Sequence, residues 1–219
     1  MAVKSNDVLK SGGSWLLLMS GWKSDYYELG EHFLQIEQVE YIEAQLKLFP
    51  LEDVTIGDAG EVNNCRVGRL IEDHPQQKPI VVNSEKATKV ISLFKSPVAL
   101  SFFKKYFEKM DSVLTIRRAQ FNVLGAGSFV GRHLDTDSNP TYKIAAVLQL
   151  GSHFTGGGFL VYENSNSTVT EAQRISPGYG SLTISFCSHE HEVEPVLMGT
   201  RTSLVFFIND FDGINPRRA

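Results

Sequence analysis

Gly131-Arg132-His133-Leu134-Asp135 is the stretch around which the predicted fold is organised. It ends a short run of strand-forming residues, and residues two apart on a strand point to the same face. The imidazole of His133 and the carboxylate of Asp135 are therefore expected side by side. One further imidazole would complete a face that can hold a metal such as Fe(II) with coordination positions left open. The alternative is a strand-end histidine hydrogen-bonded to an aspartate in a turn.

The sequence on both sides of this stretch predicts a mainly β core. From Arg117 onward, short β-branched and aromatic runs alternate with Gly, Asn, Ser and Pro. Helices followed by many short strands are typical of a β-sandwich or barrel with helices packed on one sheet, in the α+β class. The run 144–148 is apolar on both faces, as in a central strand, whereas Ser181, Thr183 and Ser185 predict a polar face that lines a cavity. Strands are expected near 117–124, 128–134, 143–150, 158–162, 169–175, 180–186, 191–197 and 200–208.

The first half of the chain predicts helices. Apolar residues recur at three- and four-residue steps over 33–48, a short helix is expected over 84–94, and Ser96 with Pro97 starts a third helix that continues to Met110. Trp15 to Met19 is expected to form a strand or an edge element. The glycine- and proline-punctuated segment 51–83 is expected to be irregular, as functional or mobile loops often are.

Bulk properties favour one domain. The 219 residues are 42% hydrophobic, enough for one substantial core. We therefore expect a single domain over 1–219, with 1–115 as a helical elaboration and candidate lid and 116–210 as the core. A net charge of −4 without a basic run argues against nucleic-acid and anionic-membrane partners. Cys65 and Cys187 lack metal-type spacing, so a reducing cytoplasm is expected.

A second stretch, 191–203, supplies what the first one lacks. His191 lies in one predicted strand and Arg201 starts the next, where Ser203 shares its face. An arginine beside a hydroxyl inside a barrel is suited to binding a carboxylate through two charge-assisted hydrogen bonds. A surface salt bridge is the alternative for Arg201, but its strand is apolar. His189 competes with His191 as the second imidazole.

These residues resemble the motif of the 2-oxoglutarate/Fe(II)-dependent oxygenase superfamily, which is His-x-Asp, a distal His and an Arg about ten residues later. The resemblance covers roughly 115–210 and implies a double-stranded β-helix (jelly-roll) core. It implies that Fe(II) is held by His133, Asp135 and His191. It also implies that 2-oxoglutarate, the cosubstrate used with O2, is held by Arg201 and Ser203. The implied reaction releases succinate and CO2 and hydroxylates an unactivated C–H bond.

Within this superfamily the chain resembles the prolyl 4-hydroxylase-like branch in Gly127 and in the turn 156–158. It departs from that branch at Leu124, where a tyrosine is usual, and at Gly158, where an acidic residue is usual. Both departures count against a protein prolyl substrate. The sequence at 127–140 and 180–186 is more similar to that of compact bacterial enzymes that hydroxylate or halogenate free amino acids. Halogenases carry glycine at the position of Asp135, so the resemblance implies a hydroxylase.

A free amino acid or derivative is therefore the expected substrate, and it needs a cation for its carboxylate and an anion for its amine. Arg69, with a solvated loop arginine as the alternative, is the candidate cation. Thr136 and Asp137 are candidates to meet an amine or hydroxyl, with turn capping as the alternative. Two other functions stay open: hydroxylation of a protein or peptide side chain, and a non-enzymatic jelly-roll module that binds a metal. The sequence does not determine the oligomeric state.

Overall fold

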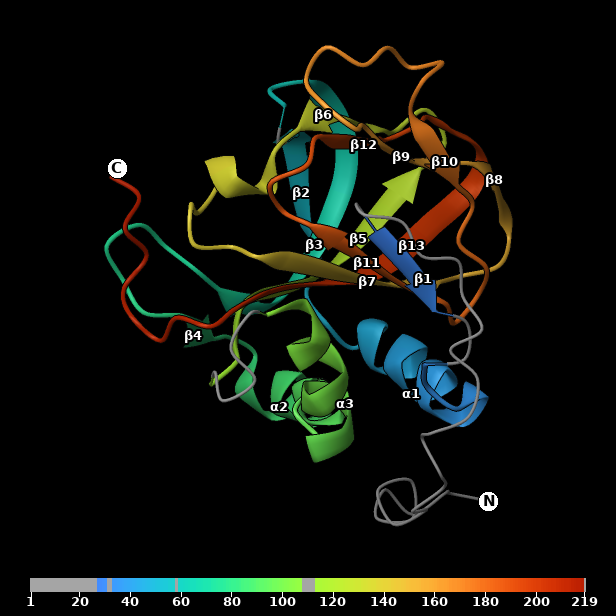
Figure 1. The fold of residues 1–219 in the computed structure, drawn as a ribbon. Coiled ribbons are helices and arrows are strands. Elements are labelled where there is room, and N and C mark those ends of the chain that lie inside the picture. Colours follow the sequence, from blue (N-terminus) through green and yellow to red (C-terminus); the bar gives the residue numbers. More distant parts are fainter. Residues whose placement is uncertain (1–26, 31–32, 58, 108–112, 219) are drawn as a thin grey trace, which may run out of the picture.

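A computed structural model describes residues 27–30, 33–57, 59–107 and 113–218 of the chain. Two antiparallel sheets face one another, and three helices cover the outer side of the larger sheet (Figure 1). This is the expected jelly-roll core with helices packed on one sheet, and the fold class is confirmed. The run from Trp15 to Met19, which was expected to form a strand or an edge element, lies outside the described residues.

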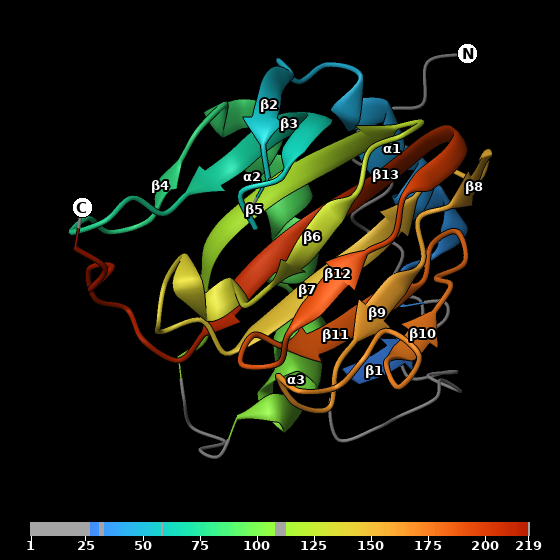
Figure 2. The ribbon, with the colours of Figure 1, turned by 90° about the horizontal axis from the view of Figure 1, so that it is seen from above.

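Within the described residues the larger sheet has nine strands and the smaller sheet four. The smaller sheet lies over the larger one when the molecule is seen from above (Figure 2). The larger sheet runs in the order β1-β11-β7-β13-β5-β3-β2, with β4 beside β3 and β8 beside β13; the smaller runs β10-β9-β12-β6. The strands are β1 Tyr27–Gly30, β2 Glu52–Ile56, β3 Val62–Glu72, β4 Ile80–Val81, β5 Thr115–Gly125, β6 Val130–His133, β7 Ile144–Leu150, β8 Phe154–Gly156, β9 Phe159–Val161, β10 Gln173–Ile175, β11 Leu182–Phe186, β12 His191–Val193 and β13 Val196–Asn209.

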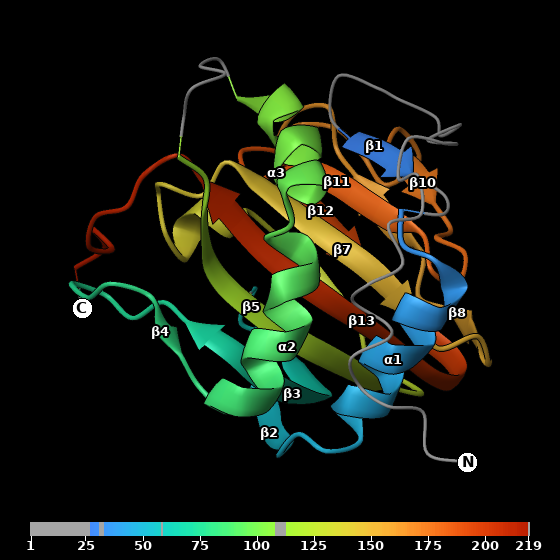
Figure 3. The same cartoon turned by 90° about the horizontal axis from the view of Figure 1, so that it is seen from below.

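The helices are α1 Ile36–Leu46, α2 Ser84–Phe94 and α3 Pro97–Phe103, followed by the 3-10 turn η1 Lys104–Tyr106. They lie across one face of the larger sheet (Figure 3). Their apolar residues and the outer side chains of that sheet form one buried cluster, in which Phe94 contacts Phe206 with ring centroids 4.1 Å apart. β7 is central and buried, as its apolar run predicted.

Ser96 caps α3 as predicted, since its hydroxyl accepts a hydrogen bond from the amide of Ala99 at 3.2 Å. The α-helix ends at Phe103, however. A 3-10 turn and an extended Phe107 follow it, so the predicted helical continuation through Phe107 is wrong. Met110 itself lies outside the described residues. Phe103 and Phe107 are both buried although only the first is helical, which explains why their spacing resembled a longer helix.

The prediction of an irregular 51–83 segment is wrong. β2 and β3 form a hairpin within this segment, and β3 pairs with β5 inside the larger sheet. A register shift between Arg69 and Ile71 interrupts the pairing, as a β-bulge does. Burial therefore follows Cys65 and Val67 and then moves to the adjacent Leu70 and Ile71. The buried positions thus change from odd-numbered residues to an adjacent pair, which breaks the two-residue alternation by which a strand is predicted.

The two strands predicted at 191–197 and 200–208 have a different boundary. β12 ends at Val193, and β13 starts at Val196 and runs without a break to Asn209. Gly199 falls in the gap between the two predicted ranges, but it lies inside β13 with a φ of 77° and pairs with Phe154 of β8, a strand that was not predicted. His191 and Arg201 nevertheless lie on consecutive strands, as expected.

Arg117 and Asp73 form a buried ion pair beside the larger sheet. Both side chains are fully buried, and the guanidinium Nη2 lies 2.6 Å from Asp73 Oδ1. Nε donates to Asp73 Oδ2 at 3.3 Å, and that oxygen also accepts a bond from the Asn139 amide at 2.7 Å. Arg117 donates in addition to the carbonyl of Gly213, so the pair holds the C-terminal segment against β5.

Replacing Asp73 by alanine should leave the Arg117 charge buried without a partner. We expect the free energy of unfolding to fall by about 3–5 kcal/mol, measured by urea denaturation. Asp212→Ala is the matched control, because its ion pair with Lys78 is exposed and should contribute less than about 1 kcal/mol. Equal effects of the two substitutions would contradict this account of the buried pair.

Candidate metal and cosubstrate site

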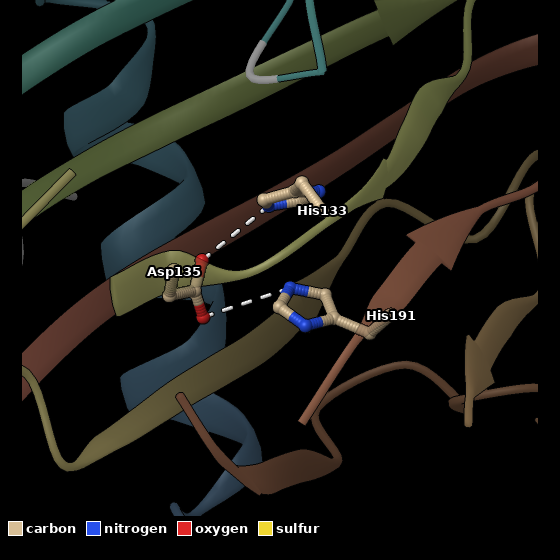
Figure 4. Close-up of side chains that lie close together, drawn as sticks. All are labelled: His133, Asp135 and His191. Carbon is tan, nitrogen blue, oxygen red and sulfur yellow. Dashed lines mark ion pairs between the residues drawn. The ribbon is translucent and has the colours of Figure 1, made fainter. Parts of the chain in front are cut away.

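His133, Asp135 and His191 meet between the two sheets. Their ligand atoms all lie within 4.8 Å of one another, and the three side chains point toward a common centre (Figure 4). His133 ends β6 and His191 begins β12, and the two residues are direct partners across the strand pair. His191, not His189, therefore joins the cluster. His189 contributes its backbone carbonyl, which lies 3.0 Å from His191 Nδ1.

Asp135 does not belong to the strand. It opens a one-turn 3-10 helix, η2 Asp135–Asp137, after an extended Leu134 with φ −109° and ψ 130°. The extended Leu134 continues the strand's alternation by one step, so Asp135 still points to the side of His133. The predicted pairing of the two side chains therefore holds, although the carboxylate sits on a turn rather than on the strand itself.

The environment of the two imidazoles favours metal binding through their Nε2 atoms. Nδ1 of His133 lies 2.8 Å from the Gly131 carbonyl, and Nδ1 of His191 makes the matching contact with His189. A carbonyl only accepts, so in the neutral form of each imidazole that can bind a metal, Nδ1 carries the proton and Nε2 presents a lone pair. The Nε2 atoms lie 3.4 Å (His133) and 3.6 Å (His191) from the Asp135 oxygens. These separations exceed those of strong hydrogen bonds and suit a shared cation between the three groups.

Asp135 carries its charge although it is 5% exposed. Burial raises the pKa of its carboxyl, but the two neighbouring histidines and Arg118 lower it by more, so the pKa lies below its ordinary value. Its Oδ2 atom is buried and accepts no hydrogen bond from the described residues. A buried carboxylate oxygen without a partner is costly unless a ligand satisfies it, and Fe(II) fits these residues in donor type and number.

The cluster lies in a pocket with about 570 Å³ of empty space, counting its open mouth. Arg201 and Ser203 of β13 line the same pocket, so the structure brings together all five residues predicted for metal and cosubstrate. Arg201 is 4% exposed, and its Nε atom has no hydrogen-bond partner among the described residues. Burial lowers its pKa to about 10, which still leaves the guanidinium charged at neutral pH. Apolar side chains form most of the remaining wall: Leu124, Val130, Ala145, Val147, Phe159, Val193, Val205 and Phe207.

Two polar residues of the pocket were not singled out individually as site residues from the sequence. Ser185 of β11 lines it, whereas Ser181 and Thr183, predicted to share that cavity-lining face, do not. Asn122 of β5 is the register partner of Ser203. Gln120 donates to Asn122 Oδ1 at 2.7 Å, which orients the Asn122 amide so that its NH2 group remains as a donor. Two-residue alternation back from Leu124 along β5 is the signal that could have found Asn122.

The three residues predicted to bind substrate are not brought together. Arg69 of β3 lines a neighbouring hollow and lies 3.1 Å from Glu52. Thr136 lines a different hollow beyond Asp135, together with Tyr142 and other residues, and Asp137 is exposed on η2. Their roles therefore stay predictions. Cys187 is fully buried in a small apolar cluster. Burial, and to a smaller extent the negative charge of Asp135, raises the pKa of its thiol, as suits a core residue.

An ion pair joins the two segments that carry the histidines. Arg132 precedes His133 and Glu190 precedes His191, and the Arg132 Nη2 atom lies 2.5 Å from Glu190 Oε2. The guanidinium also stacks 3.6 Å over the ring of Tyr162 and donates to the Ser167 carbonyl at 2.7 Å. One side chain therefore fixes β6 to β12 and to the loop after β9.

Arg132→Gln should lower the affinity for Fe(II) by about tenfold, because the two histidines would no longer be held in one geometry. Equilibrium titration with Fe(II) under anaerobic conditions measures this effect. Arg174→Gln is the matched control: it breaks an Arg–Glu pair with Glu194 that does not flank the histidines. A similar loss of affinity in both variants would show that Arg132 acts only through general stability.

Comparison with known proteins agrees with this geometry. A family model described as the 2OG-Fe(II) oxygenase superfamily matches residues 119–209. The crystal structure of an oxidoreductase of the 2OG-Fe(II) oxygenase family from Burkholderia pseudomallei is 32% identical, with a TM-score of 0.81 over 88% of this chain and 89% of that chain. The chain belongs to the 2OG-Fe(II) oxygenase superfamily. No curated protein sequence matches this oxygenase.

More distant structures share the fold of this oxygenase. A Pseudomonas putida prolyl-4-hydroxylase is 18% identical, with a TM-score of 0.57 over 88% of this chain and 93% of that chain. A Trichoplax adhaerens prolyl hydroxylase, in complex with a hypoxia inducible factor peptide fragment, is 14% identical, with a TM-score of 0.62 over 85% and 84%. Family membership makes the protein a 2-oxoglutarate-dependent oxygenase that uses Fe(II), 2-oxoglutarate and O2, and it sets aside the non-enzymatic module. No helix in the described part of the oxygenase is long and apolar enough to cross a bilayer.

Proposed function

We propose that the oxygenase hydroxylates an unactivated C–H bond of a small substrate, a free amino acid or a derivative of one. One turnover would convert 2-oxoglutarate, O2 and R–H into succinate, CO2 and R–OH. The observation that carries the proposal is the single pocket in which the His133, Asp135 and His191 cluster faces the buried Arg201 and Ser203. The cytoplasm is the proposed location.

In this proposal His133, Asp135 and His191 hold the iron, which supplies the coupling between decarboxylation of 2-oxoglutarate and oxidation of the substrate. Arg201 and Ser203 bind the far carboxylate of the cosubstrate, and the oriented amide of Asn122 adds a donor. The apolar wall excludes water, which strengthens these contacts and protects the reacting groups. The carbonyls at Gly131 and His189 keep the protons of both imidazoles on Nδ1.

A small substrate is supported by the residues that depart from the prolyl 4-hydroxylase-like branch. Leu124 is buried at 1% exposure and pairs with Arg201 across β5 and β13, so no phenol can reach the cosubstrate from this position. Gly158 packs against Glu194, since a Cβ atom placed there would lie 2.5 Å from a carboxylate oxygen. Arg69 is proposed to bind a substrate carboxylate, and Thr136 and Asp137 an amine or hydroxyl.

A protein or peptide side chain is the second candidate. Ile56 and Val62, at the tip of the β2–β3 hairpin, are 65% and 84% exposed and could contact a peptide beside the pocket. Screening free amino acids and proline-containing peptides for stimulated succinate release, with product masses read out, tests both candidates. Stimulation by a free amino acid with a gain of one oxygen supports the proposal. Stimulation by peptides alone would replace it with the second candidate.

A further inference from the structure

A second hollow adjoins the pocket of the metal cluster. The two share Asn122 and Val130 in their walls. The hollow is lined by residues of the neighbouring strands β2, β3 and β5, and by Val130 of β6. Its lining includes Cys65 and Val67 of β3 and Arg118 and Gln120 of β5. A molecule bound in this hollow would therefore be a neighbour of the metal cluster.

The hollow has two arginines in its wall, Arg69 and Arg118. Among the described residues that line it there is no aspartate or glutamate, although the Glu61 carboxylate packs against Gly57. Arg69 is already neutralised, because its Nε atom lies 3.1 Å from Glu52 and 3.7 Å from Glu72. Arg118 forms no ion pair with a described residue. Its Nε atom donates a hydrogen bond to Gln120 Oε1 at 2.9 Å, which leaves the terminal nitrogens available.

Arg118 and Arg201 stand at opposite ends of one face. β13 pairs with β5 so that Arg201 is opposite Leu124 and Phe207 is opposite Arg118. Six residue steps of extended strand separate Arg201 from Phe207, which corresponds to about 20 Å. The Arg118 guanidinium lies 5.5 Å from the ring centroid of Phe207, and Phe207 lines the pocket of the metal cluster. Arg201 thus lies in the pocket of the metal cluster, and Arg118 lies at the other end of the same face, in the adjoining hollow.

We propose that Arg118 binds an anionic group of the substrate, and that the substrate is a small acid. The inference rests on the proposed function and moves the main anion contact from Arg69 to Arg118. Gln120 holds the guanidinium, and the two terminal nitrogens form a fork that matches a carboxylate. The two arginines that line the hollow favour an anionic over a cationic group of the substrate. The anion can be the α-carboxylate or a side-chain carboxylate.

The experiment uses the Fe(II)- and 2-oxoglutarate-loaded enzyme with L-aspartate, L-glutamate, L-asparagine, L-glutamine, L-leucine, leucinamide and L-lysine as probes. Succinate release is measured under air, and binding is measured by anaerobic calorimetry. We expect an acid to bind and Arg118→Gln to raise its Kd and KM by about 10- to 100-fold, with a smaller change in kcat. Arg118→Lys should recover part of the loss. Glutamate against glutamine, and leucine against leucinamide, distinguish the side-chain carboxylate from the α-carboxylate.

Arg66→Gln is the matched control, because Arg66 lies on the same strand as Arg69 but is exposed and does not line the hollow. Its Kd and KM should equal those of the wild type. Preference for L-lysine over every acid, failure of all acids to bind, or equal Kd in Arg118→Gln and wild type would overturn the inference. Loss of Fe(II) affinity without a change in Kd would instead make Arg118 a partner of Asp135. Absence of iron-dependent 2-oxoglutarate conversion in the wild type would contradict the proposed function, while calorimetry still decides the role of Arg118.

Discussion

Replacing Asp135 by glycine should abolish iron-dependent succinate formation and lower the affinity for Fe(II) by on the order of a hundredfold or more. Asp135 provides the anionic member of the cluster, and its Oδ2 atom has no other described hydrogen-bond partner. Two neutral imidazoles alone would bind the ion weakly. Anaerobic Fe(II) titration and succinate release in the same preparation measure the two effects.

The glycine variant should nevertheless fold. Removing the carboxylate loses its attraction to the histidines and Arg118 but also removes its desolvation cost, so the thermal transition of the metal-free protein should change little. Asp212→Gly, at an exposed position, is the control for a general effect of glycine. Because the resemblance to radical halogenases places glycine at this position, we expect chloride to raise the Fe(II) affinity of the variant and not of the wild type. Unchanged iron affinity and activity in Asp135→Gly would refute the ligand assignment.

The residues predicted from the sequence are those whose relation is local along a strand. His133 and Asp135 are two apart, Arg201 and Ser203 are two apart, and such pairs share a face wherever the strand is placed. The structure places all four, with His191, in one pocket. The jelly-roll expectation depended on the same local patterns and on the resemblance.

The features that escaped prediction depend on pairing between distant segments. β3 joins the sheet through β5, which begins more than forty residues later, and its bulge disrupts the alternation that marks a strand. Arg118 and Asn122 were inside a predicted strand. Their places beside the pocket, however, follow from their register partners on β13, which are Phe207 and Ser203. No single-strand pattern contains that register, because it is fixed by the buried faces of several strands together.

Replacing Arg201 by glutamine should raise the KM for 2-oxoglutarate by about 100- to 1,000-fold, which corresponds to about 3–4 kcal/mol for a buried charge pair. The guanidinium is almost fully buried, and the turn at Gly157 packs against its stem, since a Cβ atom there would lie 2.8 Å from Arg201 Cδ. Arg201→Lys keeps the charge but not the fork, so its KM should be intermediate. Arg66→Gln, an exposed substitution, should leave the KM unchanged.

Stability measurements provide an independent test of the same contact. In the free enzyme the Arg201 charge is buried and its Nε atom is unpartnered, so Arg201→Gln should not lower the thermal transition of the metal-loaded enzyme without cosubstrate. A ligand that binds only the folded state raises stability by about 2.7 kcal/mol at a hundred times its Kd. 2-Oxoglutarate should therefore stabilise the wild type and have little effect on Arg201→Gln at the same concentration. If 2-oxoglutarate stabilised both proteins equally, Arg201 could not be its carboxylate contact, and the cosubstrate would have to bind elsewhere in the pocket.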